Sequence, residues 1–151
     1  MKEVRITPIK NGTVIDHIKP GMALKVLELL KINGDAKHGV SMAMYAVSKK
    51  QTLKDIVKVE GLELEPAVVN RLAILIPNAT ISIIRDFKVV EKYKVQLPQV
   101  VEGIARCENL NCISNQKEPI ASKLERVSMN PPRYRCFYCG RDQENVQNNI
   151  I

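Results

Sequence analysis

The sequence predicts an α+β protein of two domains, and three observations support this fold class. Hydrophobic residues alternate between strand-like and helix-like periodicity over residues 13–95. A break at Leu97-Pro98 then ends the pattern, and four cysteines lie in the chain that follows. We therefore expect one domain over residues 1–97 and a second, smaller one over residues 98–151.

The first domain begins with residues typical of strands. Residues 4–9 alternate enough to form one strand, and Asn11-Gly12 is a turn signal. Residues 13–18 are rich in β-branched side chains and end at Lys19-Pro20-Gly21. Apolar residues then recur at helical spacing over residues 22–30, so a helix follows the strand.

The next three elements repeat the change of period. Residues 40–47 alternate as a strand with both faces at least partly covered, and residues 55–60 form another, in which Lys58 points away from its apolar neighbours. Glu65-Pro66 is a helix start with proline in the first turn, and Pro77-Asn78 ends that helix.

Two more β-prone runs complete the domain, residues 80–85 and 88–95, joined at Asp86-Phe87. From residue 13 onward the order is strand, helix, strand, strand, helix, strand, with one strand added. This order is the split βαβ, or ferredoxin-like, pattern. Residues 99–106 read as a connector or a short helical turn.

The second domain is expected to be small and rich in β-structure. Residues 121–128 and 133–137 read as strands around a turn at residues 130–132, and Val146 is expected in a last short strand. So few large apolar side chains cannot fold so short a segment by burial alone. Another source of stability, such as a bound metal ion, is required.

The four cysteines have the spacing of a structural zinc site. Cys107 and Cys112 are separated by four residues, and Cys136 and Cys139 by two, so each pair fits on one tight turn. Two disulfides would need an oxidising compartment, but residues 1–30 show no pattern of a secretory signal. A redox pair usually lies at a strand-to-helix turn of a larger α/β domain, whereas Phe137-Tyr138 between the second pair lies in a short polar tail. We therefore predict one structural Zn²⁺ per chain, bound by four sulfurs in a zinc-ribbon or rubredoxin-like domain, and no open coordination site for catalysis.

The charge is divided unevenly between the two domains. The net charge is +7, and residues 1–97 hold 16 Lys plus Arg against 10 Asp plus Glu, whereas residues 98–151 hold 7 against 6. A zinc module that grips nucleic acid carries its own basic stripe, because phosphate neutralisation supplies most of the affinity. The near-neutral second domain instead favours a protein partner.

Other function classes find less support in the sequence. A nucleic-acid-binding zinc-ribbon protein stays open as an alternative because of the basic total and the four cysteines. An enzyme ranks last, since the chain lacks the common nucleophile, phosphate-loop and dinucleotide motifs. The chain also lacks an apolar run of about 18 residues, so we expect a cytoplasmic protein with no membrane partner.

Several motifs in this order resemble a known family. They are G-T-V-I-D-H-I at residues 12–18, K-D-I-V-K-V-E at 54–60, P-N-A-T at 77–80, and N-C-I at 111–113 within the four-cysteine spacing. Together they closely resemble the regulatory chain of aspartate carbamoyltransferase over nearly the whole length.

The resemblance implies a non-catalytic regulatory subunit of an enzyme of pyrimidine biosynthesis. Its N-terminal domain would be an allosteric domain that binds CTP and ATP, with UTP as a further candidate effector. Its zinc domain would dock on the catalytic chain. Regulatory chains of that family pair through their allosteric domains and bridge two catalytic trimers, so a hetero-oligomer is expected.

The resemblance also implies a set of nucleotide-binding residues. Asp16 and Lys58 match contacts to the ribose and base, and His17 and Lys92 match contacts to the triphosphate. Ser82 lies near the base, where the best-studied members have Asn. The lining of the base pocket would come from six residues: Ile9, Val14, Ile56, Ile84, Phe87 and Val89. Phe87 replaces a Tyr of those members, and Asn109 and Asn111 match positions that face the catalytic chain.

Overall fold

A computed structural model describes most of the chain as two compact units, Met1–Gln96 and Leu97–Ile151. The residues described are 9–31, 39–50, 52–116, 120–129 and 132–151. The strand expected over residues 4–9 falls outside them except for Ile9, which is buried but belongs to no strand.

The first unit is a five-stranded antiparallel sheet with two helices. Its elements in chain order are β1 Gly12–Ile18, α1 Ala23–Leu29, β2 Val40–Val47, β3 Leu53–Glu60, α2 Pro66–Leu75, β4 Thr80–Arg85 and β5 Lys88–Lys94. The strand order is β2-β3-β1-β4-β5, and all neighbours are antiparallel. This is the split βαβ arrangement that the sequence predicts, with β5 added beside β4.

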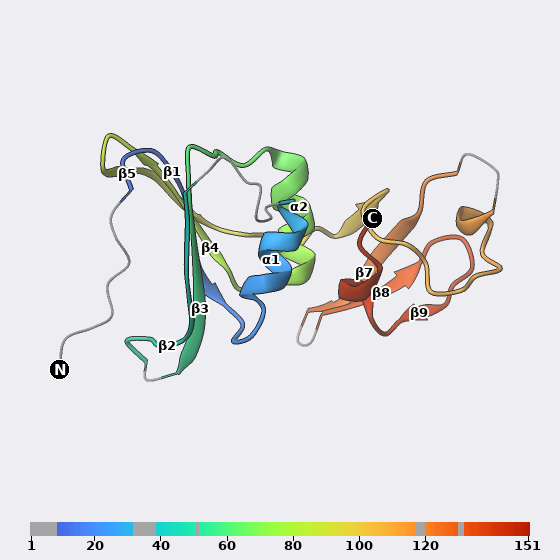
Figure 1. Ribbon diagram of the computed structural model, residues 1–151. Coiled ribbons are helices and arrows are strands. Elements are labelled where there is room, and N and C mark those ends of the chain that lie inside the picture. Colours follow the sequence, from blue (N-terminus) through green and yellow to red (C-terminus); the bar gives the residue numbers. More distant parts are fainter. Residues whose placement is uncertain (1–8, 32–38, 51, 117–119, 130–131) are drawn as a thin grey trace. The chain divides into compact units, whose positions relative to one another are not determined.

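Both helices cover the same face of this sheet (Figure 1). Alternate strand residues such as Ile15, Val57 and Ile81 point into this layer and are buried, together with Val26 of α1 and Leu72 of α2. Burying each such side chain stabilises the fold by about 1.5–3 kcal/mol. Among the described residues no helix covers the opposite face, which carries both polar and apolar side chains, such as Lys58, Ser82 and Val14.

A buried carboxylate joins three elements of the first unit. Asp55 of β3 is fully buried and accepts hydrogen bonds from the backbone N–H groups of Gly21 (2.8 Å), Ala23 (3.1 Å) and Tyr45 (2.8 Å). Tyr45 has a positive φ of 57°, where the β2–β3 register shifts. Asp55 thereby fixes both the start of α1 and the bulge in β2.

The second unit is a four-stranded antiparallel sheet with two short 3-10 helices. Its elements are β6 Val100–Glu102, η1 Ile113–Asn115, β7 Lys123–Met129, β8 Pro132–Cys136, β9 Asp142–Gln143 and η2 Val146–Asn149, with strand order β6-β7-β8-β9. The expected strand at Val146 is wrong, because this residue begins η2. Residues 99–106, predicted to be a connector or a short helical turn, contain the strand β6, which pairs with β7.

The core of the second unit is small. Val101, Leu124 and Tyr134 are buried in it, and Arg126 donates a hydrogen bond to the carbonyl of Leu97. The Tyr134 hydroxyl donates to the carbonyl of Pro98 over 2.9 Å. These bonds hold the first residues of the unit against its own sheet. Across both units, no helix of the described residues is long and apolar enough to cross a membrane.

Candidate functional site

The four cysteine sulfurs come together at one point in the second unit. Their Sγ atoms all lie within 4.8 Å of one another, with Cys107 and Cys139 separated by 3.7 Å and Cys112 and Cys136 by 3.6 Å. Four sulfurs placed tetrahedrally about 2.3 Å from one ion are about 3.8 Å apart, whereas a disulfide needs about 2.05 Å. All four cysteines are free thiols, so the arrangement fits a metal ion and not a disulfide pair.

Each pair of sulfurs is held by a tight turn. In the first, the N–H of Cys112 donates to the carbonyl of Asn109 over 3.0 Å, and the Asn115 side chain donates to the carbonyls of both Cys107 and Asn109. In the second, the N–H of Gly140 donates to the carbonyl of Cys136 over 3.0 Å. These hydrogen bonds fix the backbone of each turn, and the turns in this way hold the four sulfurs in position.

The protein surroundings act differently on the individual thiols. Burial raises the pKa of the Cys107 thiol to about 12. Burial also acts to raise the pKa of Cys139, but hydrogen bonds, first among them that of the Arg141 backbone, outweigh it and lower the pKa to about 7. A divalent metal ion would hold all four as thiolates, and four sulfur ligands close its coordination sphere. Such a site stabilises a fold and leaves no position for a reacting water.

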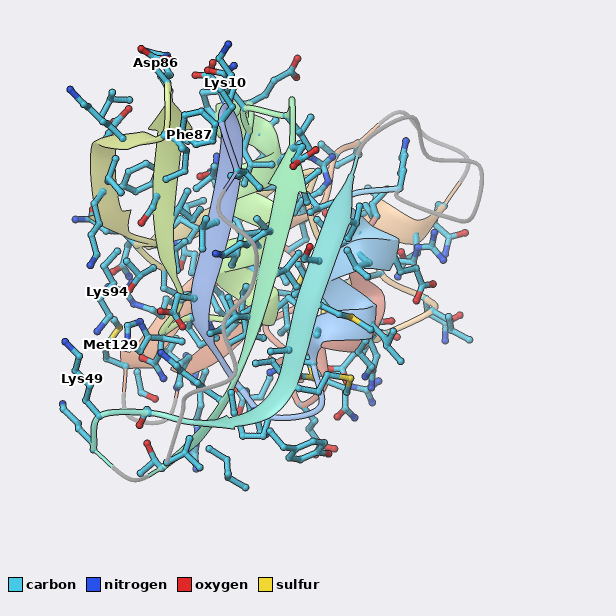
Figure 2. The ribbon with its side chains drawn as sticks, turned by 60° about the vertical axis from the view of Figure 1, so that its left-hand side comes forward. Lys10, Lys49, Asp86, Phe87, Lys94 and Met129 are labelled. Carbon is cyan, nitrogen blue, oxygen red and sulfur yellow. The ribbon has the colours of Figure 1, made fainter. Side chains whose placement is uncertain are left out.

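The open face of the first sheet holds a second group of predicted residues. Lys58 of β3 lies opposite Val14 of β1, Val14 lies opposite Ser82 of β4, and Ser82 lies opposite Lys92 of β5. These four residues form one row across four neighbouring strands, which we call the central row. Three strand spacings of about 4.8 Å give this row a length of roughly 14 Å. Figure 2 looks onto this face, with both helices behind the sheet.

The next row toward the C-terminal end of β1 is ionic. Asp16 lies opposite Thr80, and Thr80 lies opposite Lys94. The Asp16 carboxylate is bound by the Lys54 ammonium at 3.0 Å, and both side chains are partly exposed. Ile56 of β3, half-buried between Lys54 and Lys58 in the strand alternation, belongs to the same face.

His17 reaches this row because β1 is irregular there. Its φ is 57°, and the β1–β3 register shifts between Ile15 and Ile18. The His17 N–H donates to the Asp16 carboxylate over 2.6 Å, and its ring Nδ1 lies 3.1 Å from the Thr80 hydroxyl. The bulge therefore brings two consecutive side chains to one face, which a regular strand cannot do.

The other end of the face is apolar. Gly12 lies opposite Ile84, and Ile84 lies opposite Val89. The Cδ1 atom of Ile9 lies 3.0 Å from the position that a Cβ on Gly12 would occupy. Ile9 and Ile84 are buried, while Val89 is exposed. The face thus grades from apolar side chains at one end to charged side chains at the other.

A strained hairpin turn borders this apolar end. Asp86 and Phe87, between β4 and β5, have φ values of 53° and 64°. Asp tolerates this left-handed region, but a bulky residue such as Phe rarely adopts it, at a cost of about 1–3 kcal/mol. Asn11 Oδ1 accepts from the N–H of Asp86, and the Lys10 carbonyl accepts from the N–H of Phe87. Both labelled turn residues lie beside Lys10 in Figure 2. The Phe87 ring is held outward and exposed.

The eleven residues expected around a nucleotide therefore lie on or beside one face, and three neighbours were missed. Lys54, Thr80 and Lys94 share the ionic row but were not among the expected site residues. Lys54 could have been found, since it stands four residues before Lys58 on one strand and so shares its face. Thr80 depends on the register between β1 and β4, which are distant in sequence, and Lys94 joins the row through the register of the β4–β5 hairpin.

Comparison with known proteins identifies the family of the chain. The family model of the aspartate carbamoyltransferase regulatory chain, allosteric domain, matches residues 4–96, and that of the metal binding domain of the same chain matches residues 99–149. The chain belongs to the family of aspartate carbamoyltransferase regulatory chains.

Individual members are similar over nearly their whole length. The regulatory chain of Pyrococcus abyssi is 51% identical over 151 residues, covering 97% of each chain. That of Methanothrix thermoacetophila is 51% identical over 138 residues, covering 91% of this chain and 90% of the relative. That of Archaeoglobus fulgidus is 47% identical over 152 residues, covering 99% of each.

Family membership decides between the function classes. This chain is a regulatory subunit of aspartate carbamoyltransferase and not a catalytic one, and a nucleic-acid-binding zinc ribbon is not favoured. The four sulfurs lie in the metal-binding domain of the family, and their arrangement fits one structural zinc ion. The open face of the sheet lies in the allosteric domain.

Proposed function

We propose that this regulatory chain binds nucleoside triphosphates on the open face of its five-stranded sheet. The observation that carries the proposal is the central row, Lys58, Val14, Ser82 and Lys92, placed side by side by strand register. CTP and ATP are the proposed effectors, and UTP is a third. All three nucleotides contain a ribose and a triphosphate. The charged and polar side chains of the central and ionic rows are suited to bind these groups.

The charge of the face favours an anion. Lys54, Lys58, Lys92 and Lys94 lie on it, against the single carboxylate of Asp16 among the residues of its central and ionic rows. Lysine ammonium groups bind phosphate oxygens as point charges. We assign the triphosphate to Lys92 and His17, and the ribose hydroxyls to Asp16, which can accept their hydrogen bonds.

The apolar end suits a planar base. Val89 and Phe87 are exposed there, while Ile9 and Ile84 form a buried floor. We assign the base to this end, with Val14 and Ile56 beside it. Ser82 offers a hydroxyl in the central row, so it is the side chain that we expect to influence the choice between CTP and ATP.

The metal domain is proposed to dock on the catalytic chain. Leu110, in the first cysteine loop, is 79% exposed, and Asn111 and Ile113 beside it are also exposed. Two exposed apolar side chains close together on one loop, Leu110 and Ile113, suit a protein interface better than a free surface. Asn109 has a local role, since its side chain accepts from the N–H of Asn111 over 3.1 Å.

Pairing of two regulatory chains is proposed at strand β2. This strand is at the edge of the sheet, and its Val47 is 70% exposed. Met42 and Tyr45 of β2 and Leu53 of β3 are exposed as well. Residues 40–47 are predicted to have both faces at least partly covered, but exposed residues alternate with half-buried ones along β2. An exposed apolar edge strand is a template for pairing, and a second copy of the chain would cover it.

In this proposal, paired regulatory chains bridge two catalytic trimers, and nucleotide binding shifts the equilibrium between the quaternary states of this assembly. The coupling free energy between the sites is typically about 1–3 kcal/mol in such systems. We place the assembly in the cytoplasm, where thiols remain reduced and available to a metal.

Binding of CTP and ATP to the zinc-loaded chain, measured by calorimetry, tests the nucleotide site. Lys92→Glu should weaken binding at least tenfold, because it replaces attraction to the triphosphate with repulsion. Lys25→Glu, which makes the same charge change on the exposed surface of α1, should leave binding unchanged. Equal losses in both variants would show that net charge, and not this face, governs binding.

A second experiment tests assembly and control. The full chain, with and without zinc, is mixed with aspartate carbamoyltransferase catalytic trimers, and the aspartate saturation curve is measured with each nucleotide. Zinc-loaded chain should associate and make the curve respond to CTP and ATP. If the zinc-loaded chain associates with trimers but no nucleotide alters the curve, docking stands and nucleotide control fails.

A further inference from the structure

A buried glutamine contacts the metal site without being one of its expected ligands. Gln143 is the second residue of β9 and is 7% exposed. Its Nε2 atom lies 3.5 Å from Cys107 Sγ and 2.9 Å from the carbonyl oxygen of Arg141. Its Oε1 atom accepts from the N–H of Glu108 over 2.8 Å. One amide group therefore makes three hydrogen bonds in the interior of the domain.

The orientation of this amide follows from its partners. A sulfur and a carbonyl oxygen are both acceptors, so they must face the NH₂ group, and the N–H of Glu108 must face the amide oxygen. The reverse orientation would place the amide oxygen against the sulfur and the carbonyl oxygen, and the NH₂ group against the N–H of Glu108. Gln143 thus donates an N–H to a sulfur of the metal cluster.

Such a donor has a chemical purpose at a four-thiolate site. Four thiolates around one Zn²⁺ carry a net charge of about −2, and three of the four cysteines are buried. Hydrogen bonds to sulfur spread this charge and stabilise the ligand in its metal-binding form. A second side chain acts similarly, since the Ser114 hydroxyl lies 3.2 Å from Cys112 Sγ.

Gln143 also joins the two cysteine turns. Glu108 follows Cys107 in the first turn, while Arg141 follows the second turn and its carbonyl accepts from the N–H of Cys136. We propose that Gln143 is a positioning residue of the metal centre, which holds the Cys107 sulfur and both turns in place and so slows loss of the metal.

The fold should survive substitution of this residue. The Glu108 carboxylate accepts from the N–H groups of Glu144 and Asn145, so the segment after β9 stays attached to the first turn by bonds that do not involve Gln143. Gln143→Glu keeps the shape and the acceptor for Glu108, but removes the donor and adds a negative charge beside the sulfurs. Gln143→Met keeps the approximate volume and removes every amide hydrogen bond.

The experiment measures zinc release from the full-length chain to a chromophoric chelator. We expect release to be about 10–100-fold faster for Gln143→Glu, as for other outer partners of metal ligands, and less accelerated for Gln143→Met. Gln147→Glu, which adds the same charge at an exposed position of η2, should release zinc at the wild-type rate.

A spectroscopic measurement separates hydrogen bonding from packing. With Co²⁺ in place of zinc, both Gln143 variants should shift the sulfur-to-metal charge-transfer bands, because the electron density on Cys107 Sγ changes. Gln147→Glu should not shift them. Wild-type release rates in both Gln143 variants, or faster release with unchanged bands, would overturn the proposal.

Discussion

The two units of this regulatory chain solve the problem of stability in opposite ways. In the allosteric unit, β-strands and two helices bury apolar side chains such as Ile81 and Leu72, and the face proposed for nucleotides lies outside that core. In the metal-binding unit, the sulfurs of Cys107, Cys112 and Cys136 are themselves buried core atoms. The first unit should therefore stay folded whether or not a ligand is bound, whereas the second unit should unfold when its metal is removed.

Removal of the metal is the strongest test of this difference. Chelation, or Cys136→Ser, should unfold the metal-binding unit, because apparent binding energies of structural zinc are about 10–16 kcal/mol and count as folding energy. Hydrogen exchange should show amides of β7 and β8 losing protection while those of β1 and β4 keep it. Acidification should act in the same direction, since protons compete with the metal for the four thiolates.

If β7 and β8 stayed protected in a metal-free chain, apolar burial alone would suffice to stabilise both units, and the proposed difference between them would be wrong. Nucleotide binding gives the matching control. It should persist after chelation, since none of its proposed residues lies in the metal-binding unit.

A core truncation in the allosteric unit should have the next largest effect. Leu72 is fully buried in α2, so Leu72→Ala should lower the free energy of unfolding of that unit by about 2–5 kcal/mol, through lost burial and a residual cavity. Urea denaturation of the zinc-loaded chain measures it. Leu24→Ala on the exposed side of α1 should change stability by less than about 0.5 kcal/mol.

The zinc release rate should be unchanged in Leu72→Ala. If truncating this helix residue accelerated zinc loss as much as it destabilised the sheet, the two units would not be energetically separate.

The smallest effect is expected from a single hydrogen bond in the metal-binding unit. Tyr134→Phe removes the bond to the Pro98 carbonyl and should cost about 1 kcal/mol at neutral pH. Burial raises the pKa of Tyr134 to about 12, against an ordinary value near 10. The native state therefore holds this proton more tightly than the unfolded state does.

The sign of the pH dependence follows from that difference. The contribution of Tyr134 is fully present below pH 10 and is lost as the pH rises from about 10 toward about 12, because the unfolded phenol ionises first. Urea denaturation at pH 7, 9 and 11 should show the gap between wild type and Tyr134→Phe shrinking at pH 11. A constant gap would mean that the phenol is not protected in the native state.

Hydrophobic periodicity located most elements of the first unit because each is long enough to show its period. The helix starting at Pro66 and the strand ending at Arg85 both appear as expected. The strand β6, which spans three residues, and the 3-10 helix at Val146 could not be predicted, because such short segments show no period. Thr80 was overlooked because its partner His17 is 63 residues away in the chain.

The sequence by itself determined what depends on local spacing: the order of strands and helices, the two tight turns that carry the cysteines, and the family to which they belong. Only the tertiary structure decided which distant side chains became neighbours. The bulge that turns His17 toward Thr80, and the amide of Gln143 against Cys107, both depend on contacts between segments far apart in the chain. Periodicity reports which face a residue prefers, but the register between strands is fixed by packing of the whole unit.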